Sequence, residues 1–369
     1  MGREPGAGVP AGTTVGQWMF GRCVVVATCV FAMLLGGLPA AGALAPPSSG
    51  DPAVIAAVAP ILDRSVQRSV SVVVVDGERV RYANFGAEND TQYEIGSITK
   101  TFTAALFVDS VRRGEVREDT RLEELLPLGG TPAGGVTLLD LASHRSGLPP
   151  FALTADMAAG GLGWVVGRNP FEFDREQLLA QARQTPLLTP GRNQYSTFGY
   201  ALLGQALAAA AHTDYSTLLT ERMLRSLELS DTWIPLTESA LPPGATTGFD
   251  VLGRSQPAWP LDGYAPAGGV RSTIADMGAY TSQLLDGSVP GESAMDLQWS
   301  FADGGRSGLT WKAMESAGTQ YTVHSGTTGG FQSVIVLDRQ HDRGVVILSN
   351  TIGQLEDSAI EILQTTPFS

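Results

Sequence analysis

The sequence predicts an α/β fold of the α+β type, and two observations lead to that prediction. Short β-rich runs occur near both ends of the chain, whereas the long stretch between them has mostly helical patterns. Strands at both ends with helices between them favour one antiparallel sheet that carries an inserted all-helical region. We therefore expect a sheet subdomain over about 53–90 and 255–369, and a helical subdomain over about 91–254.

The amino-terminal elements follow from local patterns. A helix is expected at 53–66, followed by strands at 70–75 and 79–85. An Asp-Gly pair at 76–77 separates the two strands, and such a pair is a strong hairpin signal. The next helix, 97–113, ends before a glycine. It is apolar on almost all sides, so we expect it to be buried.

The remaining elements continue in order to the carboxyl end. Residues 236–269 are dense in proline and glycine, so they are expected to form a long ordered loop that walls a site. The other helices are expected at 138–143, 175–184, 197–211, 215–227, 273–286 and 354–363, and the strands at 321–325, 332–338 and 344–349.

Residues 1–43 have the pattern of a secretory signal peptide. Arg3 and Arg22 precede an apolar run at 23–38, and an Ala-x-Ala cleavage site ends at Ala43. The alternative is an uncleaved membrane anchor, for which the apolar run is a little short. We therefore expect a secreted, extracytoplasmic protein with a linker at 44–52 and a single domain over 53–369.

The composition excludes several classes of function. A net charge of −13 disfavours binding to nucleic acid and to anionic membranes. Cys23 and Cys29 lie inside the predicted signal peptide, so a mature chain would have neither disulfides nor a catalytic thiol. The four histidines show no metal-binding spacing, so neither a metal site nor a cofactor is predicted. No later run is long enough to span a membrane.

The strongest chemical signal is a serine followed three residues later by a lysine. The chain has only two lysines, and one of them, Lys100, lies three residues after Ser97 at the start of the predicted helix. Residues three apart share a helix face. The positive end of a helix also favours negative charge developing on the serine. A lysine in a dry pocket can lose its proton and act as the base, so this pair forms a nucleophile and its base.

Further segments combine into a pattern that resembles the penicillin-recognising serine hydrolases. Within them the chain is similar to the branch of class C β-lactamases, D-alanyl-D-alanine carboxypeptidases and related esterases. That resemblance implies a β-lactamase/transpeptidase-like fold and covers about residue 70 to the carboxyl end. The segments that carry it are 97–100, 144–149, 195–196, 268–273 and 324–326.

The resemblance implies a role for each motif residue. Ser97 would become acylated, and Lys100 and Tyr195 would share the proton transfers. The Lys100 charge would lower the Tyr195 pKa from its usual value of about 10. Backbone N–H groups of Ser97 and Thr327 would form the oxyanion hole.

The substrate would lie against a short list of binding residues, namely Thr197, His324, Ser325, Gly326 and Thr327. His324 is expected to be a pocket wall rather than a base, and His144 is expected to brace a loop. Thr197 stands where the family usually has asparagine. Because threonine is shorter and has a single hydroxyl, recognition of a substrate amide by this residue is in doubt.

The sequence leaves the substrate open among carboxylic esters, β-lactams and D-Ala-D-Ala peptides, because one acyl-transfer chemistry serves all three. A second class of hypothesis is a binding protein that is acylated once by a penicillin or wall peptide, or not at all. A small-molecule or peptide substrate is expected in every case. The oligomeric state is not predicted.

Overall fold

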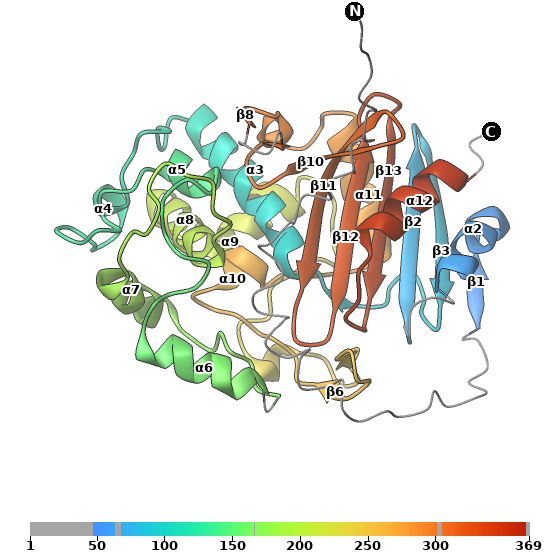
Figure 1. Ribbon diagram of the computed structural model, residues 1–369, viewed down its shortest axis with the longest axis horizontal. Coiled ribbons are helices and arrows are strands. Elements are labelled where there is room, and N and C mark those ends of the chain that lie inside the picture. Colours follow the sequence, from blue (N-terminus) through green and yellow to red (C-terminus); the bar gives the residue numbers. More distant parts are fainter. Residues whose placement is uncertain (1–46, 63–67, 166, 301–304, 367–369) are drawn as a thin grey trace, which may run out of the picture. The chain divides into compact units, whose positions relative to one another are not determined.

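A nine-stranded antiparallel sheet forms the frame of the computed structural model, which describes residues 47–62, 68–165, 167–300 and 305–366 (Figure 1). Strands β2 (Val70–Asp76) and β3 (Arg79–Phe85) come from the amino end, and β2 pairs directly with β13 (Arg343–Ser349). Strands from the two ends of the chain are therefore neighbours in one sheet, as the sequence predicted. The other strands are β1 (Ser48–Gly50), β8 (Trp299–Ser300), β9 (Arg306–Ser307), β10 (Lys312–Ser316), β11 (Thr319–Thr327) and β12 (Gln332–Asp338).

Both faces of the sheet are covered. On one face, Val72 and Val74 of β2 share a core with α2 (Pro52–Leu62) and α12 (Glu356–Thr365). On the other face, Val73 and Val75 belong to the larger core, which includes α11 (Ile274–Leu285) and the helical region. A strand buried on both faces reads as a continuous apolar run, which explains the valines of this segment.

The helical region lies beside the sheet and shares its core (Figure 1). Its two long buried helices are α3 (Thr99–Arg112) and α8 (Thr197–Ala210). Around them lie α4 (Leu122–Leu125), α5 (Leu138–Ala142), α6 (Ala155–Val165), α7 (Arg175–Gln184), α9 (Tyr215–Leu219) and α10 (Ala265–Gly268). The short elements are η1 (Gly96–Ile98), η2 (Thr220–Leu224), η3 (Glu238–Ala240) and η4 (Glu292–Met295), with strands β4 (Tyr93–Glu94), β5 (Gly248–Phe249), β6 (Ser255–Gln256) and β7 (Arg271–Ser272).

Several local predictions were incomplete. The predicted helix over 97–113 begins as the 3₁₀ turn η1, and its α-helical part starts only at Thr99. The predicted loop at 236–269 contains η3, β5, β6 and the whole of α10. The sequence analysis did not find β10, since the short run Lys-Ala-Met-Glu-Ser lacks the alternation of a strand.

The predicted signal peptide lies outside the described residues. Residues 48–50 of the predicted linker form β1, which pairs with β3. Among the helices of the described ranges, none is long and apolar enough to cross a membrane.

Candidate active site

Ser97 and Lys100 meet at the junction of η1 and α3. The Lys100 Nζ lies 3.0 Å from the Ser97 Oγ, and Ser97 is partly exposed to solvent. A second hydrogen bond, 2.6 Å long, runs from Nζ to the carbonyl oxygen of Ala267 in α10. The structure therefore places the predicted nucleophile within direct proton-transfer distance of the predicted base.

Lys100 is completely buried, and this burial controls its protonation. Desolvation holds the pKa of its amine well below the usual value. A neutral amine has a lone pair that can accept the proton of the Ser97 hydroxyl. The geometry thus suits Lys100 to act as a general base at neutral pH.

The Tyr195 ring lies between a histidine and two lysines. Its centroid is 4.6 Å from that of His144, 5.0 Å from the Lys100 Nζ and 5.8 Å from the Lys312 Nζ. Burial raises the Tyr195 pKa, and a hydrogen bond with Ser97 opposes that rise only in part. The expectation that the neighbouring Lys100 charge lowers this pKa was wrong, because desolvation of the phenolate dominates and the buried amine itself favours its neutral form. Tyr195 therefore keeps its proton and is suited to donate it.

His144 braces the Tyr195 turn from both sides. Its carbonyl oxygen accepts the N–H of Gln194 at 2.7 Å, and its Nδ1 accepts the N–H of Ser196 at 3.1 Å. These two residues flank Tyr195 in the sequence. His144 itself has a left-handed backbone, with φ of 57°. The prediction of a bracing role agrees with this geometry.

Thr310 links the two buried histidines of the site. Its Oγ1 lies 2.9 Å from the His324 Nε2 and 3.4 Å from the His144 Nε2. Since the His144 Nδ1 accepts a hydrogen bond from the Ser196 N–H, its Nε2 carries the hydrogen of the neutral ring and donates to the Thr310 Oγ1. The His324 Nδ1 donates to the Ser325 carbonyl oxygen, so its Nε2 accepts from the Thr310 hydroxyl. When both histidines are neutral, each ring nitrogen of His144 and His324 has a hydrogen-bond partner.

The neutral state of these histidines also follows from their surroundings. Burial is the main cause and lowers both pKa values well below the ordinary range, and whenever Lys100 or Lys312 carries its proton, that positive charge lowers them further. The Nε2 of His324 is therefore occupied by Thr310, and this histidine is poorly placed to serve as a base.

Two glycines allow the backbone of η1 to touch β11. A Cβ atom on Gly326 would lie 2.1 Å from the Ile95 carbonyl oxygen and 2.8 Å from the Ser97 nitrogen. A Cβ on Gly96 would lie 2.8 Å from the Thr327 nitrogen, and Gly96 has a φ of +50°. The N–H groups of Ser97 and Thr327 are thus brought together, as an oxyanion hole requires.

The residues after Tyr195 begin α8. Ser196 is the N-cap: its Oγ accepts the Gly199 N–H at 2.8 Å and donates to the Pro149 carbonyl oxygen at 2.7 Å. Thr197 is the first residue of the helix and is half-buried, and Ser325 is half-buried at the end of β11. Ser196 therefore has a structural role.

Sequence reasoning missed Lys312, the second lysine of the chain. Lys312 lies in β10, which pairs with β11. The residue as a whole is exposed to solvent, whereas its Nζ lies over the Tyr195 ring. Partial desolvation there lowers its pKa. The rarity of lysine was the one signal that could have found it, since both lysines of the chain lie at this site.

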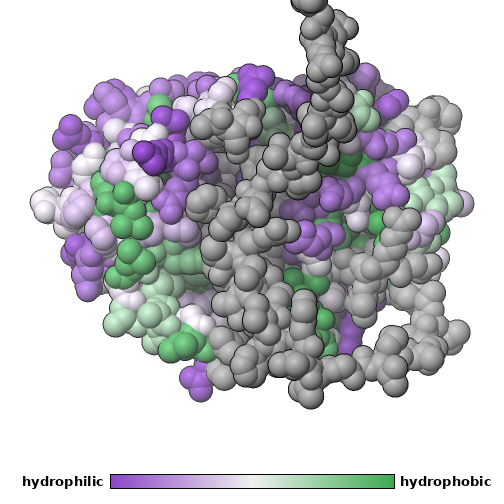
Figure 2. All heavy atoms as spheres, in the orientation of Figure 1, coloured by the Kyte–Doolittle hydropathy of each residue, from purple (hydrophilic) through white to green (hydrophobic). Residues whose placement is uncertain are grey.

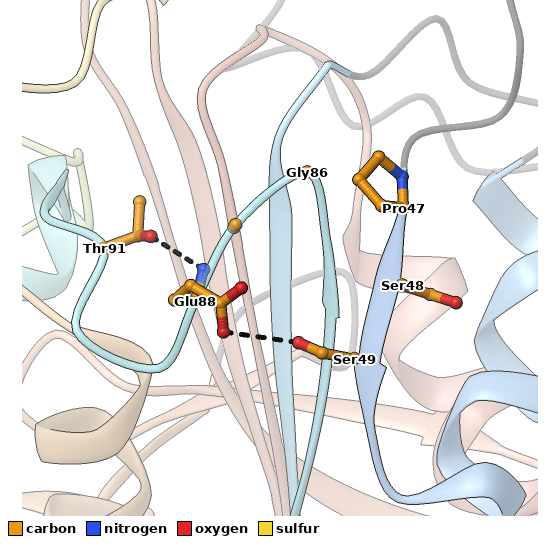
Figure 3. A pocket seen from close by; sticks show the side chains of 7 residues that line it. Pro47, Ser48, Ser49, Gly86, Glu88 and Thr91 are labelled. Carbon is orange, nitrogen blue, oxygen red and sulfur yellow. Dashed lines mark hydrogen bonds between the residues drawn. The ribbon is translucent and has the colours of Figure 1, made fainter.

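Two cavities lie away from the nucleophile. One of about 520 Å³ lies beside β1 and β3, where Glu88 accepts a hydrogen bond from Ser49 (Figure 3). Another of about 300 Å³ is lined by Asp214, Asp262 and Arg175 among others. Neither is lined by Ser97, Lys100 or Tyr195. Within the described ranges, no group of three or more His, Cys, Asp or Glu side chains is placed to hold a metal ion.

Comparisons with known proteins agree with this geometry. The sequence profile of the β-lactamase family matches residues 54–364. A β-lactamase of Pseudomonas fluorescens is 24% identical over 79% of this chain and 91% of its own length. The D-alanyl-D-alanine-carboxypeptidase/endopeptidase AmpH of Escherichia coli strain K12 is 27% identical over 58% of this chain and 57% of its own length. The chain also spans about half the length of two other curated relatives that it matches.

A solved structure has the same fold. The class C β-lactamase of Rhodobacter sphaeroides superposes with a TM-score of 0.72 at 21% identity, over 86% of this chain and 98% of that one.

The close approach of η1 and β11 leads to a first prediction. Gly326→Ala should lower the rate of acylation by about 10²–10³-fold, because the added methyl displaces the backbone that carries an oxyanion donor. Labelling with a fluorophosphonate measures that rate. Gly135→Ala is the matched control, since its Cβ would meet nothing within 4 Å. Normal labelling of Gly326→Ala would show that these backbones do not form the oxyanion hole.

The burial of Lys100 leads to a second prediction. Lys100→Arg should slow acylation by about 10²–10⁴-fold, because a guanidinium keeps its proton at working pH. In the parent enzyme, kcat/KM should rise with pH at a midpoint well below 10.4, the ordinary lysine pKa, and this limb should disappear in the variant. Lys312→Arg is the matched comparison and should lose less than about tenfold, since it keeps its charge. A pH profile unchanged by Lys100→Arg would contradict the base assignment.

Proposed function

Because this chain belongs to the β-lactamase family, we propose that it is an exported serine hydrolase that prefers carboxylic esters to β-lactams and D-Ala-D-Ala peptides. Membership of the family makes it a penicillin-recognising type of serine hydrolase. The observation that carries the ester preference is Thr197 at the first position of α8, two residues after Tyr195. The preference, the export and the roles below belong to this proposal.

Acylation begins with the neutral Lys100 amine accepting the proton of the Ser97 hydroxyl. The Ser97 Oγ then forms a bond to the carbonyl carbon of the ester, and the carbonyl oxygen takes the negative charge. The N–H groups of Ser97 and Thr327 stabilise that oxyanion. When the tetrahedral intermediate collapses, the bond to the leaving oxygen breaks and Tyr195 supplies its proton. The protonated Lys100 returns a proton to Tyr195.

Deacylation repeats the same steps with water as the nucleophile. Water loses a proton to the site base, its oxygen bonds to the acyl carbon, and the Ser97 Oγ leaves with a proton. The free acid departs and the resting enzyme returns. The raised pKa keeps Tyr195 protonated at working pH, so the residue holds a proton that it can give in both halves of the cycle.

The ester preference rests on the hydrogen-bonding capacity of residue 197. An asparagine offers one donor group and one acceptor to the acylamino group of a β-lactam or peptide, whereas threonine offers a single hydroxyl. A buried amide left unpaired costs about 1–3 kcal/mol. A simple ester carries no such amide, so it avoids this cost and also has a better leaving group.

A single-turnover binding protein is the second candidate, and Thr197 is again the feature that favours it. If amide recognition is weak, a penicillin or wall peptide could acylate Ser97 without efficient release. A burst of product without turnover separates this candidate from an enzyme.

Thr197→Asn tests the preference. The parent should hydrolyse short-chain p-nitrophenyl esters and turn over a chromogenic cephalosporin and a D-Ala-D-Ala peptide weakly. The variant should shift the ratio of specificity constants toward the amide-bearing substrates by about tenfold or more, which corresponds to 1.4 kcal/mol. Ser97→Ala is the control and should abolish every activity. A parent that already prefers β-lactams or peptides, with no shift in the variant, would refute the proposal.

Export is tested separately at the amino terminus. The charged start, apolar run and Ala-Gly-Ala site of residues 1–43 support cleavage after Ala43. Sequencing of exported protein should begin at Leu44 or within a few residues of it. A mature protein that still contains Cys23 would identify the segment as an anchor instead.

A further inference from the structure

We propose that three aromatic side chains, Phe151, Phe171 and Trp259, form an apolar wall that binds the acyl group of the ester. We call this set the aromatic wall. The inference rests on the proposed ester hydrolysis and goes beyond it, because it names the chemical class of the acyl group. The class is an apolar chain of several carbons or an aryl-substituted acyl group, in contrast to the polar acylamino group of penicillins.

One end of the wall is fixed to the two segments that form the oxyanion hole. The backbone N–H of Trp259 donates to the Glu94 Oε1 at 2.8 Å, and Glu94 lies two residues before Gly96. On the other segment, a Cβ atom on Gly329 would lie 2.5 Å from the Trp259 Nε1. Gly329 lies two residues after Thr327. Trp259 therefore packs against residues that flank both segments of the proposed oxyanion hole.

The other end of the wall lies beside Thr197. The Pro150 carbonyl oxygen accepts the N–H of Phe198 at 3.1 Å, which places the backbone of Phe151 next to the first turn of α8. Phe171 joins the two ends: its centroid is 5.5 Å from that of Phe151 and 5.5 Å from that of Trp259. The wall thus runs from the oxyanion hole toward the residue that would contact an acylamino group.

Buried polar contacts hold the two loops of the wall together. Asn169 is buried, and its side chain donates to the Pro260 carbonyl oxygen at 3.0 Å while accepting the Phe171 N–H at 3.0 Å. The Gly263 N–H donates to the Phe173 carbonyl oxygen at 2.9 Å. The fully buried Tyr264 ring lies 5.3 Å from that of Phe171 and backs it. A pre-formed wall binds a ligand without a large ordering cost.

The surface near the wall is apolar as well. All three wall residues are half-buried. Leu153 and Leu188 are 54% and 51% exposed. Leu153 lies two residues after Phe151, and the Leu188 N–H donates to the Gly147 carbonyl oxygen at 2.7 Å. In Figure 2, hydrophobic residues gather on the visible face in the region where Figure 1 shows α6. Such a surface favours hydrocarbon.

The test varies only the acyl group. Purified protein is assayed with p-nitrophenyl acetate, butyrate, hexanoate and phenylacetate, which share one leaving group. The parent should show a kcat/KM for hexanoate and phenylacetate at least about tenfold above that for acetate, within the range expected for added methylenes in an apolar pocket. Phe171→Ala should reduce the hexanoate-to-acetate ratio by about fivefold or more.

Matched variants keep the test decisive. Phe173→Ala removes a similar ring from the same loop, one whose contact is with Tyr264 at 6.1 Å, and it should preserve the ratio. If Phe171→Ala does not fold, Trp259→Phe at the other end of the wall gives the same readout, a lowered ratio. Equal kcat/KM values for all four esters in the parent would overturn the aromatic wall and leave ester hydrolysis standing. The same conclusion would follow if Phe173→Ala lowered the hexanoate-to-acetate ratio as much as Phe171→Ala does. Failure to hydrolyse any ester would overturn both proposals.

Discussion

The site depends on one backbone contact, the close approach of residues 95–97 to residues 326–327. Glycine is needed on both sides of it, at Gly96 and Gly326, because a Cβ on either would strike the opposite backbone. The Ser333 hydroxyl donates to the Ile95 carbonyl oxygen at 2.8 Å and ties η1 to β12 as well. Just before this turn, the buried Glu94–Arg271 ion pair, 3.1 Å apart, anchors β4 to β7. Sheet, helical region and nucleophile are thereby fixed at a single point.

Burial at that point decides which groups carry protons. Lys100 is desolvated and its bonds are to a hydroxyl and a carbonyl oxygen, so its neutral form is favoured. Tyr195 is desolvated too, and the same effect keeps its phenol protonated. One physical cause therefore prepares a base and an acid that both contact Ser97. The His144–Thr310–His324 chain fits this arrangement, because its hydrogen bonds are complete with both rings uncharged.

The sequence predicted the parts of the molecule whose signals are local. Strands β2 and β3, the Asp-Gly turn between them, and the Ser97–Lys100 pair all lie in short segments with clear patterns. The parts it did not predict depend on contacts between distant segments. Thr310 joins His144 across 166 residues, and Lys312 reaches Tyr195 only because β10 pairs with β11. The direction of the Tyr195 pKa also required the structure, since neighbouring charges can be guessed from motifs but burial cannot.

The same division separates chemistry from specificity. The groups that take part in the bond changes lie on η1, α3 and β11, which are held by the sheet and by the glycine contact, and on the turn before α8, which His144 holds. The residues proposed to choose the acyl group lie instead on the segments before α6, between α6 and α7, and before α10, joined mainly by Asn169 and aromatic packing. Loops of this kind can change composition without moving Ser97 or Lys100. The proposed ester preference and the proposed aromatic wall therefore describe one adaptation, in which hydrocarbon replaces an amide as the group next to the reacting carbonyl.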